Sequence, residues 1–286
     1  MITSKTSFLA LIGNPVQHSL SPIIHNAVIN SLDLDLVYLA LPCDPGNFNI
    51  VINTLKYVNC KGLNITIPFK EKAFHLCKEV TPIAKKIKAI NTLKLNLNGE
   101  WYGTNTDVDG FIYPLKPFDL KGKKSIVLGS GGAARSAIQG LLDLNLNQII
   151  IISRNENSLN KIIEDFRNHN NIKGIHSNDN KIQHLISESD LIVNTTPVGM
   201  ASVKKGELNL PFGENCWKSL NSKTIVYDLI YNPKETYLIK LASKKGCSTI
   251  DGSEMLIAQG AKSLEFWTDG LEIPINVMRN SLKGFL

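Results

Sequence analysis

A glycine-rich turn near the middle of the chain restricts the possible folds more than any other segment. Residues 129–135 read GSGGAAR and fit the pattern G-x-G-x-x-A. The apolar run 124–128 before the turn is a predicted strand, residues 133–144 after it form a predicted helix, and the apolar run 148–152 is the next predicted strand. A strand, a glycine turn, a helix and a further strand in this order predict a dinucleotide-binding domain with a parallel sheet.

Each small residue of this turn has a physical role in such a domain. Gly129 permits the tight turn, Gly131 leaves room for a pyrophosphate at the backbone, and Ala134 lets the helix pack closely on the strand. The phosphates would bind the free N–H groups at the positive end of the helix dipole. A glycine pattern alone is a weak signal, so a turn with only a structural role is the alternative.

The end of the following strand reads Ser153-Arg154-Asn155. A site that prefers NAD usually has an acidic residue here for the ribose 2′-hydroxyl, whereas an arginine suits the 2′-phosphate of NADP. The hydroxyl of Ser153 offers a further contact. We therefore predict NADP as the cofactor, and the alternative is that Arg154 is an ordinary surface residue.

Predicted strands and helices alternate through the whole chain. Ser21 and Pro22 are typical of a helix start, with the serine as cap and the proline in the first turn. Apolar residues recur at helical spacing over residues 252–269, which predicts a C-terminal helix. The other predicted strands cover residues 8–12, 37–41, 62–67, 190–194 and 224–229, and the other predicted helices cover 23–31, 47–58 and 70–80.

This alternation predicts an α/β fold of two domains. We expect an N-terminal α/β substrate domain with a mainly parallel sheet over residues 1–106 and a Rossmann-like NADP-binding domain over 107–250. Residues 251–286 are expected to form C-terminal helices that return to the first domain.

Composition narrows the possible partners. The 286 residues carry a formal net charge of +6, which suits anionic ligands, without the Lys/Arg stripe of a nucleic-acid-binding protein. No apolar run is long enough to span a membrane. The five cysteines are scattered and none stands at C-x-x-C spacing. We therefore expect no metal site, and reduced thiols in a cytoplasmic compartment.

Four short stretches place hydroxyl and amide side chains where loops should border the sheet of the first domain. A polyol substrate requires such groups, because each buried hydroxyl needs a hydrogen-bond partner. Within them, Lys70 can donate a proton to a forming alkoxide and Asp107 can hold that lysine. Each residue also has a structural interpretation, as a helix cap, a strand-end partner or a solvated surface residue. The stretches are residues 18–22 (HSLSP), 64–70 (NITIPFK), 91–92 (NT) and 105–107 (NTD).

In their order and spacing, these stretches and the glycine turn resemble the shikimate dehydrogenase family. Further likenesses follow Asn194 at residues 195–200 (TTPVGM) and occur at 231–233 (YNP) and 251–259. The resemblance covers almost the whole chain. It implies an NADP-dependent enzyme that reversibly reduces 3-dehydroshikimate to shikimate, a step toward chorismate and the aromatic amino acids. The alternatives are a quinate/shikimate dehydrogenase with relaxed cofactor use and an NADP-binding regulator without turnover.

The resemblance also implies site residues. Lys70 and Asp107 would form the catalytic pair, and we expect them to meet across the crevice between the two domains. Small molecules would be the partners, with no nucleic acid or membrane, and the protein would be a monomer or a homodimer. One position departs from the family pattern: Ser158 stands where a second basic residue is frequent, and Lys161 is a possible substitute.

The remaining implied residues contact the two ligands. Those for the substrate are Ser19, Ser21, Asn64, Thr66, Lys70, Asn91, Asp107, Tyr231 and Gln259. Those for the cofactor are Gly129, Ser130, Gly131, Gly132, Ala133, Ala134, Arg135, Ser153, Arg154, Asn155, Thr195, Met200, Leu229 and Gly252.

Overall fold

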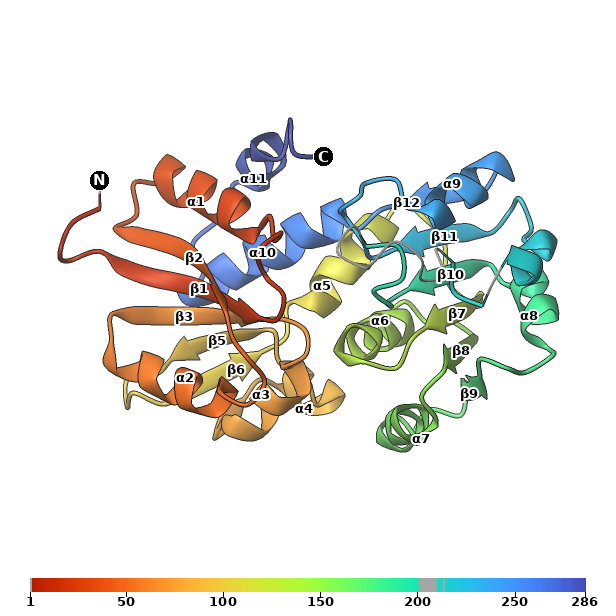
Figure 1. Ribbon diagram of the computed structural model, residues 1–286, viewed down its shortest axis with the longest axis horizontal. Helices are drawn as coiled ribbons and strands as arrows, with labels where there is room; N and C mark the ends of the chain where they lie inside the picture. Colours follow the sequence, from red (N-terminus) through yellow and green to blue (C-terminus); the bar gives the residue numbers. More distant parts are fainter. Residues whose placement is uncertain (1, 201–209, 213) are drawn as a thin grey trace. The chain divides into compact units, whose positions relative to one another are not determined.

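The computed structural model describes residues 2–200, 210–212 and 214–286 (Figure 1). The chain divides into two compact units. Unit 1 contains residues 1–110 and 256–285, and unit 2 contains residues 111–255 and the last residue, Leu286. The divisions fall inside two helices, α5 (Asp107–Ile112) and α10 (Ser253–Trp267), rather than in loops. The apolar pattern of the sequence does not reveal a domain boundary inside a helix, because the helical periodicity continues across that boundary.

Unit 1 contains a mixed sheet with the strand order β2-β1-β3-β5-β6-β4 in its described residues. The pairs β3–β5 and β5–β6 are antiparallel, and the other three pairs are parallel. The sheet is therefore mainly parallel, as expected. Its strands are β1 (Ser7–Gly13), β2 (Leu36–Pro42), β3 (Cys60–Ile65), β4 (Glu79–Val80), β5 (Thr92–Leu95) and β6 (Trp101–Thr104).

Helices cover both faces of this sheet (Figure 1). On one face, α2 (Phe48–Thr54), α3 (Lys70–Leu76) and α4 (Pro82–Ile87) bury an apolar core in which the rings of Phe48 and Phe69 stack 4.2 Å apart. On the other face, α1 (Ser21–Ser31) packs beside α11 (Ile275–Ser281). Residues 256–285 belong to unit 1, so the predicted return of the C-terminal helices to the first domain is confirmed.

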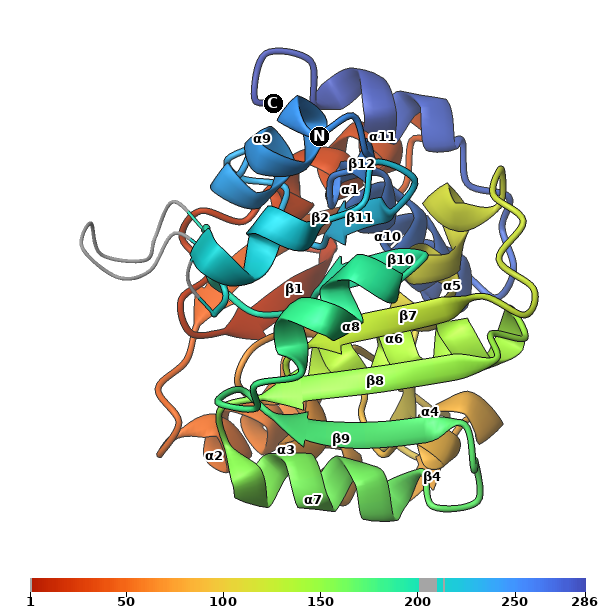
Figure 2. The same ribbon diagram turned by 90° about the vertical axis from the view of Figure 1, so that its right-hand side faces the viewer.

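Unit 2 has a wholly parallel sheet in its described residues, with the strand order β12-β11-β10-β7-β8-β9 (Figure 2). The order reverses between β7 and β10, as in a Rossmann domain. The predicted Rossmann-like fold is confirmed. The strands are β7 (Lys124–Leu128), β8 (Gln148–Ser153), β9 (Ile172–His176), β10 (Leu191–Asn194), β11 (Ile225–Asp228) and β12 (Ser248–Ile250).

The unit 2 sheet is also covered on both faces. Trp217, on the short helix η3 (Glu214–Ser219), packs with α8 (Ile182–Glu188) and α9 (Tyr237–Lys244) over one face. The helices α6 (Gly132–Asp143) and α7 (Glu156–Asp165) lie over the other. Single 3₁₀ turns η1 (Leu55–Tyr57) and η2 (Tyr113–Leu115) complete the described helices.

Several local predictions differ from the structure. Ser21 is not a helix cap: Leu20 is the cap residue without a side-chain bond, and Ser21 is the first helical residue. The helix predicted over 70–80 ends at Leu76, and the chain then forms β4. The hairpin of β5 and β6 escaped prediction, although its turn contains Asn98-Gly99, with Gly99 at φ +73°. That dipeptide is a strong hairpin signal.

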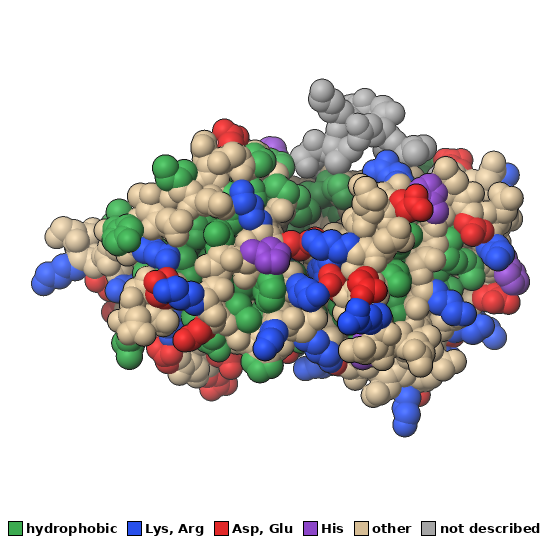
Figure 3. Space-filling model, turned by 90° about the horizontal axis from the view of Figure 1, so that it is seen from below, with side chains coloured by type: hydrophobic (Ala, Val, Ile, Leu, Met, Phe, Trp, Pro, Cys, Tyr) green, Lys and Arg blue, Asp and Glu red, His purple; other side chains and the backbone are tan. Residues whose placement is uncertain are grey.

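Charged side chains of both signs are visible on one face of the molecule (Figure 3). On the face shown in Figure 3, Lys and Arg side chains lie among Asp, Glu and uncharged side chains. Among the described residues, no helix is long and apolar enough to cross a bilayer. The same part of the chain has no group of three or more His, Cys, Asp or Glu side chains that could hold a metal ion.

Candidate active site

Lys70 and Asp107 form a short, buried ion pair. The Nζ atom of Lys70 lies 2.6 Å from Oδ2 of Asp107, and the two side chains are 14% and 6% exposed. Lys70 begins α3 and Asp107 begins α5, so both stand in the first turn of a helix. Asp107 belongs to unit 1, as does Lys70. The expectation that they meet across a crevice between domains was therefore wrong, because α5 carries its first residues in unit 1.

Asn91 fixes the second oxygen of the Asp107 carboxylate. Its Nδ2 donates to Oδ1 of Asp107 at 2.9 Å and to Oγ1 of Thr106 at 2.9 Å. The Oδ1 of Asn91 accepts from the backbone N–H of Thr106 at 2.8 Å. Both carboxylate oxygens therefore have donors, and the carboxylate is held in one orientation toward Lys70.

A buried cluster of hydroxyl and amide groups continues from this point. The Oδ1 of Asn64 accepts from the Tyr38 hydroxyl at 2.7 Å, and its Nδ2 donates to Oγ of Ser263 at 3.0 Å. The Ser263 hydroxyl also lies 2.9 Å from Oγ1 of Thr92 and 3.1 Å from Oγ1 of Thr106. In this state the Asn64 amide is occupied within the protein, so its contact with a substrate stays a prediction.

Sequence reasoning missed Tyr38 and Ser263 as members of this cluster, whereas Thr92 lies in one of the four predicted polar stretches without an assigned role. Ser263 stands four residues after Gln259 on α10 and therefore on the same helical face. That spacing was the available signal for Ser263. Gln259 itself lies 3.4 Å from Nδ2 of Asn91 through its Oε1.

The residues expected at a substrate carboxylate lie near the start of α1. The hydroxyls of Ser19 and Ser21 are 3.2 Å apart, and Ser19 also accepts from the backbone N–H of Ser21. Thr66 follows β3 and is partly exposed. Tyr231, expected at the same carboxylate, belongs to unit 2. The structure therefore brings the two serines together, and the contact with Tyr231 stays a prediction.

The glycine turn lies at the carboxyl end of β7, where the strand order of unit 2 reverses. This switch point is where open α/β sheets bind their ligands. Gly129 has φ +108°, a conformation that side chains disfavour. A Cβ on Gly131 would meet nothing within 4 Å, so this glycine borders open space. Ala134 is fully buried against the sheet. The backbone geometry thus fits a pyrophosphate at the start of α6.

The segment after β8 borders the same edge. Arg154 is exposed and makes no ion pair with another described residue. The Ser130 hydroxyl of the glycine turn lies 2.8 Å from that of Ser153 and 2.6 Å from that of Ser158. Asn155 caps α7 by accepting from the backbone N–H of Ser158 at 2.9 Å. An exposed arginine that directly follows β8, together with the three serine hydroxyls at this edge, fits a phosphate group.

Arg135 has a different environment from the one expected. Its side chain is 1% exposed, and Nη2 lies 2.7 Å from Oδ2 of Asp165 on α7. The guanidinium therefore holds α6 against α7 and does not reach solvent. Any cofactor contact of Arg135 would have to come from its backbone, and it stays a prediction without support from this geometry.

Further loops at this edge make two close approaches. The loop after β10 approaches the glycine turn, and Gly252 approaches the segment after β11. A Cβ on Gly129 would lie 2.7 Å from Oγ1 of Thr195, in the loop that leads to Met200. A Cβ on Gly252 would lie 2.1 Å from the carbonyl oxygen of Leu229. Only glycine fits there without a shift of the backbone. Met200 is partly exposed.

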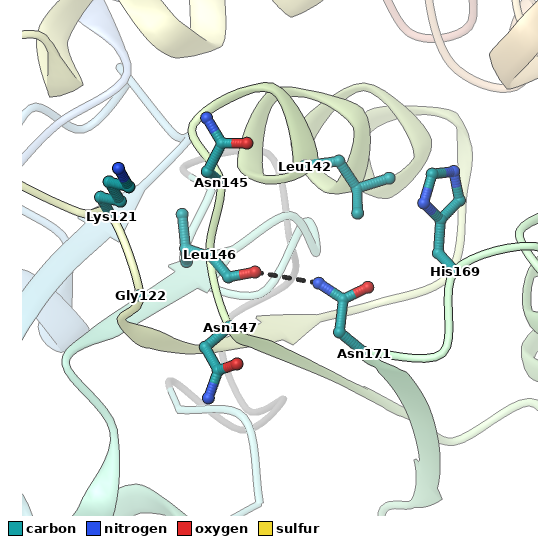
Figure 4. A pocket seen from close by; sticks show the side chains of 8 residues that line it. All are labelled: Lys121, Gly122, Leu142, Asn145, Leu146, Asn147, His169 and Asn171. Atoms are coloured by element: carbon teal, nitrogen blue, oxygen red, sulfur yellow. Dashed lines mark hydrogen bonds between the residues drawn. The ribbon is translucent and has the colours of Figure 1, made fainter.

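A hollow of about 430 Å³ elsewhere in unit 2 is not the cofactor site (Figure 4). Lys121, Asn145, His169 and Asn171 line it, beside the amino ends of β7, β8 and β9. Ligands of parallel α/β sheets bind at the opposite, carboxyl ends. The amide of Asn171 is already bonded to the Leu146 carbonyl at 2.9 Å.

Comparison with known proteins identifies the matching families. Residues 11–93 match the shikimate dehydrogenase substrate binding domain, residues 115–226 match shikimate / quinate 5-dehydrogenase, and residues 252–283 match the shikimate 5'-dehydrogenase C-terminal domain. The chain is 63% identical, over the full length of both chains, to shikimate dehydrogenase (NADP(+)) of Prochlorococcus marinus subsp. pastoris.

Solved structures agree with this match. Shikimate dehydrogenase from Aquifex aeolicus superimposes with a TM-score of 0.87 at 34% identity, over 99% of this chain and 100% of that one. The Thermus thermophilus enzyme in complex with NADP(H) and shikimate gives 0.82 at 29% identity, over 98% and 100%. Quinate dehydrogenase from Corynebacterium glutamicum in complex with NAD gives 0.84 at 26% identity, over 98% and 99%. The predicted resemblance is confirmed: the chain belongs to the shikimate dehydrogenase family.

Proposed function

We propose that this chain is an NADP-dependent shikimate dehydrogenase, which interconverts 3-dehydroshikimate and shikimate on the route to chorismate and aromatic amino acids. The observation that carries the proposal is the buried contact of 2.6 Å between Lys70 and Asp107, beside a cluster of buried hydroxyl and amide groups. The curated relative that is 63% identical bears the same activity in its name.

The reaction is a hydride transfer coupled to a proton transfer. The ketone, NADPH and a proton give the alcohol and NADP⁺, and the bound cofactor supplies the hydride. The Lys70 ammonium donates a proton to the oxygen as negative charge develops there, and it recovers that proton in the reverse direction. Asp107 keeps the lysine oriented, since its two oxygens bond Lys70 and Asn91. The partly buried location strengthens this electrostatic contribution.

Polar side chains of unit 1 would orient the ring. The Ser19 and Ser21 hydroxyls would bind the substrate carboxylate, with Tyr231 near it. Thr66 and Gln259 would bind ring hydroxyls, as would Asn64 and Asn91 if their amides exchange an internal partner for the ligand. Such contacts hold the reacting carbon in one geometry and so lower the entropic barrier.

Unit 2 would bind the dinucleotide. The glycine turn and the first N–H groups of α6 would hold the pyrophosphate, and Arg154 would pair with the 2′-phosphate. The free guanidinium and the absence of an acidic residue directly after β8 favour NADP over NAD. Ser158 offers a hydroxyl at the position where the family frequently has a second basic residue.

Quinate dehydrogenation with relaxed cofactor use is the second candidate. The fold likeness to quinate dehydrogenase in complex with NAD favours it, because the two activities share one architecture. A regulator that binds NADP without turnover is disfavoured, since it would not need a buried ammonium–carboxylate pair.

A cytoplasmic location and a monomeric or homodimeric state complete the proposal. The described cysteines are all free thiols, which suits a reducing compartment.

A four-way assay tests the function. The purified protein is mixed with shikimate or quinate, each with NADP⁺ or NAD⁺, and the absorbance of reduced nicotinamide is recorded. Shikimate with NADP⁺ should give the highest kcat/KM. Faster turnover of quinate with NAD⁺ would support the second candidate, and binding of NADP⁺ without turnover of either acid would support the regulator.

A further inference from the structure

Asp228 is a buried carboxylate that the proposed chemistry does not use. It ends β11 and is 0% exposed. Its contacts within the described part of the chain are hydrogen bonds rather than ion pairs. A buried charge without a counter-ion is costly unless several donors compensate it. The segments that supply these donors therefore indicate what the carboxylate does.

Three donors reach Asp228 from three separate segments. Oδ1 accepts from Nδ2 of Asn194 at 3.0 Å, at the end of β10, and from the backbone N–H of Ile230 at 3.2 Å. Oδ2 accepts from Oγ1 of Thr236 at 2.7 Å, which also caps α9. One carboxylate thus joins the loop after β10, the loop after β11 and the start of α9.

The carboxylate also fixes the orientation of the Asn194 amide. An ionised aspartate only accepts hydrogen bonds, so Asn194 must present its NH₂ group to Asp228 and its oxygen to the other side. That oxygen accepts from the backbone N–H of Thr196 at 3.0 Å and from its hydroxyl at 2.7 Å. The second hydrogen of the NH₂ group bonds the Val198 carbonyl at 3.3 Å. The charge of Asp228 therefore shapes residues 195–198.

These loops border the proposed cofactor site directly. The Thr195 hydroxyl donates to the Leu128 carbonyl at 2.6 Å, and a Cβ on Gly129 would lie 2.7 Å from it. On the other side, the Ile230 carbonyl accepts from the N–H of Gly252 at 3.0 Å. A change at Asp228 can therefore affect both Gly129 and Gly252, because only one or two contacts separate each of them from it.

The ionised state of Asp228 opposes folding. Burial, with a smaller contribution from the like charge of Asp251 on the β12 side, raises the pKa of Asp228 to about 6. The hydrogen bonds from Asn194, Ile230 and Thr236 act in the opposite direction without cancelling the effect of burial. The partners from β10 and α9 do not titrate. An asparagine would fill the same space without this cost, and such perturbed groups are typical of functional sites.

We propose that Asp228 is a positioning residue for the nicotinamide dinucleotide: its carboxylate holds the loops after β10 and β11 in the shape that binds the cofactor. The proposal rests on the proposed function, because it assumes that these loops contact the dinucleotide.

The test compares wild-type protein with Asp228→Asn. An asparagine has one acceptor oxygen instead of two, so it loses either the bond from Thr236 at Oδ2 or the bonds from Asn194 and Ile230 at Oδ1, together with the charge that strengthens them. We expect the Kd for NADPH, measured by the fluorescence of the reduced nicotinamide, to rise about tenfold, the effect of one or two lost hydrogen bonds. The melting temperature at pH 8 should not fall, because the variant removes a charge that the fold disfavours.

A loss of NADPH affinity without a fall in melting temperature distinguishes a positioning role from a structural role. A structural role alone predicts that affinity and melting temperature fall together, and this result would overturn the proposal, as would an unchanged Kd. If wild-type protein itself fails to bind NADPH, the proposed function fails instead. Asp190→Asn is the matched control, since Asp190 bonds the Lys124 N–H at the opposite end of the sheet. Its Kd should equal that of wild type.

A second pair of variants covers the case in which Asp228→Asn does not fold. Thr236→Ser keeps the hydroxyl donor and should bind NADPH as wild type does. Thr236→Val removes the donor and should weaken binding severalfold. Equal affinities in this pair would also contradict the proposal.

The pH dependence gives an independent readout. Protonated Asp228 resembles asparagine, so the ratio of the Kd of Asp228→Asn to that of wild type should shrink as the pH falls from 8 to 5. Titration of the cofactor itself cancels in this ratio. A ratio that stays constant over this range would overturn the role of the charge.

Discussion

Replacement of Lys70 by methionine separates the catalytic contribution of the ion pair from its structural one. Methionine has a similar length without the ammonium. Loss of general acid–base catalysis should lower kcat by about a hundredfold to ten-thousandfold, with little change in the substrate KM. An unchanged kcat would remove Lys70 from the mechanism.

The stability loss can be estimated from the geometry. At the observed separation of 2.6 Å, the attraction between the two charges is about 6 kcal/mol at an effective dielectric constant of 20. The side chains are 14% and 6% exposed, so solvent screens this attraction little. Without Lys70 the Asp107 carboxylate loses its counter-ion but keeps Asn91 as a donor at 2.9 Å, which offsets part of the loss. We therefore expect a loss of about 2–4 kcal/mol at pH 7.

A double variant completes the test. Lys70→Met with Asp107→Asn leaves two neutral groups and should recover most of the stability lost in Lys70→Met, because no unpaired charge remains buried. Its kcat should stay as low as that of the single variant. The stability comes from urea unfolding at pH 7 and kcat from the reduced-nicotinamide absorbance. Recovery of kcat together with stability would refute the assignment of Lys70 as the proton donor.

Four further predictions follow from other residues. Arg154→Ala should raise the KM for NADPH about tenfold or more and that for NADH less than about twofold, since a charge-assisted bond to phosphate contributes about 1.5–3 kcal/mol; equal effects would contradict the 2′-phosphate role. Gly131→Ala should cost less than about 1 kcal/mol in unfolding free energy, as its Cβ would meet nothing within 4 Å, yet weaken NADPH binding in a titration. Burial lowers the pKa of His25 to about 3, so stability should fall as the pH drops from about 6.5 toward 3, and acid titration of His25→Phe, monitored by circular dichroism, should show a smaller loss. Burial raises the pKa of Cys60 to about 12, so native protein treated with iodoacetamide at pH 8 should show that peptide unmodified by mass spectrometry.

The sequence identified the dinucleotide-binding unit because its signals are local. The glycine turn lies between a strand and a helix. Gly129 has a positive φ that favours glycine, and Gly131 borders open space. The Arg154 prediction is equally local, because the end of a strand can be read from the apolar run before it. Both depend on neighbours in the chain rather than on distant contacts.

Other features depend on contacts that no local pattern reveals. The predicted second domain begins at residue 107, whereas Asp107 belongs to unit 1 and its carboxylate bonds Lys70 there. Arg135 fits the glycine-turn pattern, but its guanidinium pairs with Asp165 from the next helix. Ser263 joins the polar cluster through contacts with Asn64, about two hundred residues earlier in the chain. Such long-range packing overrides the local expectation.

The most direct measurement of the central claim is a crystal structure of the protein with shikimate and NADP⁺ bound. We expect Nζ of Lys70 to lie within hydrogen-bond distance, about 2.6–3.2 Å, of the oxygen on the carbon that is oxidised. The contact of Lys70 with Asp107 should persist in that complex. A lysine amine that points into solvent, away from the substrate oxygen and from Asp107, would contradict the assignment of Lys70 as the proton donor.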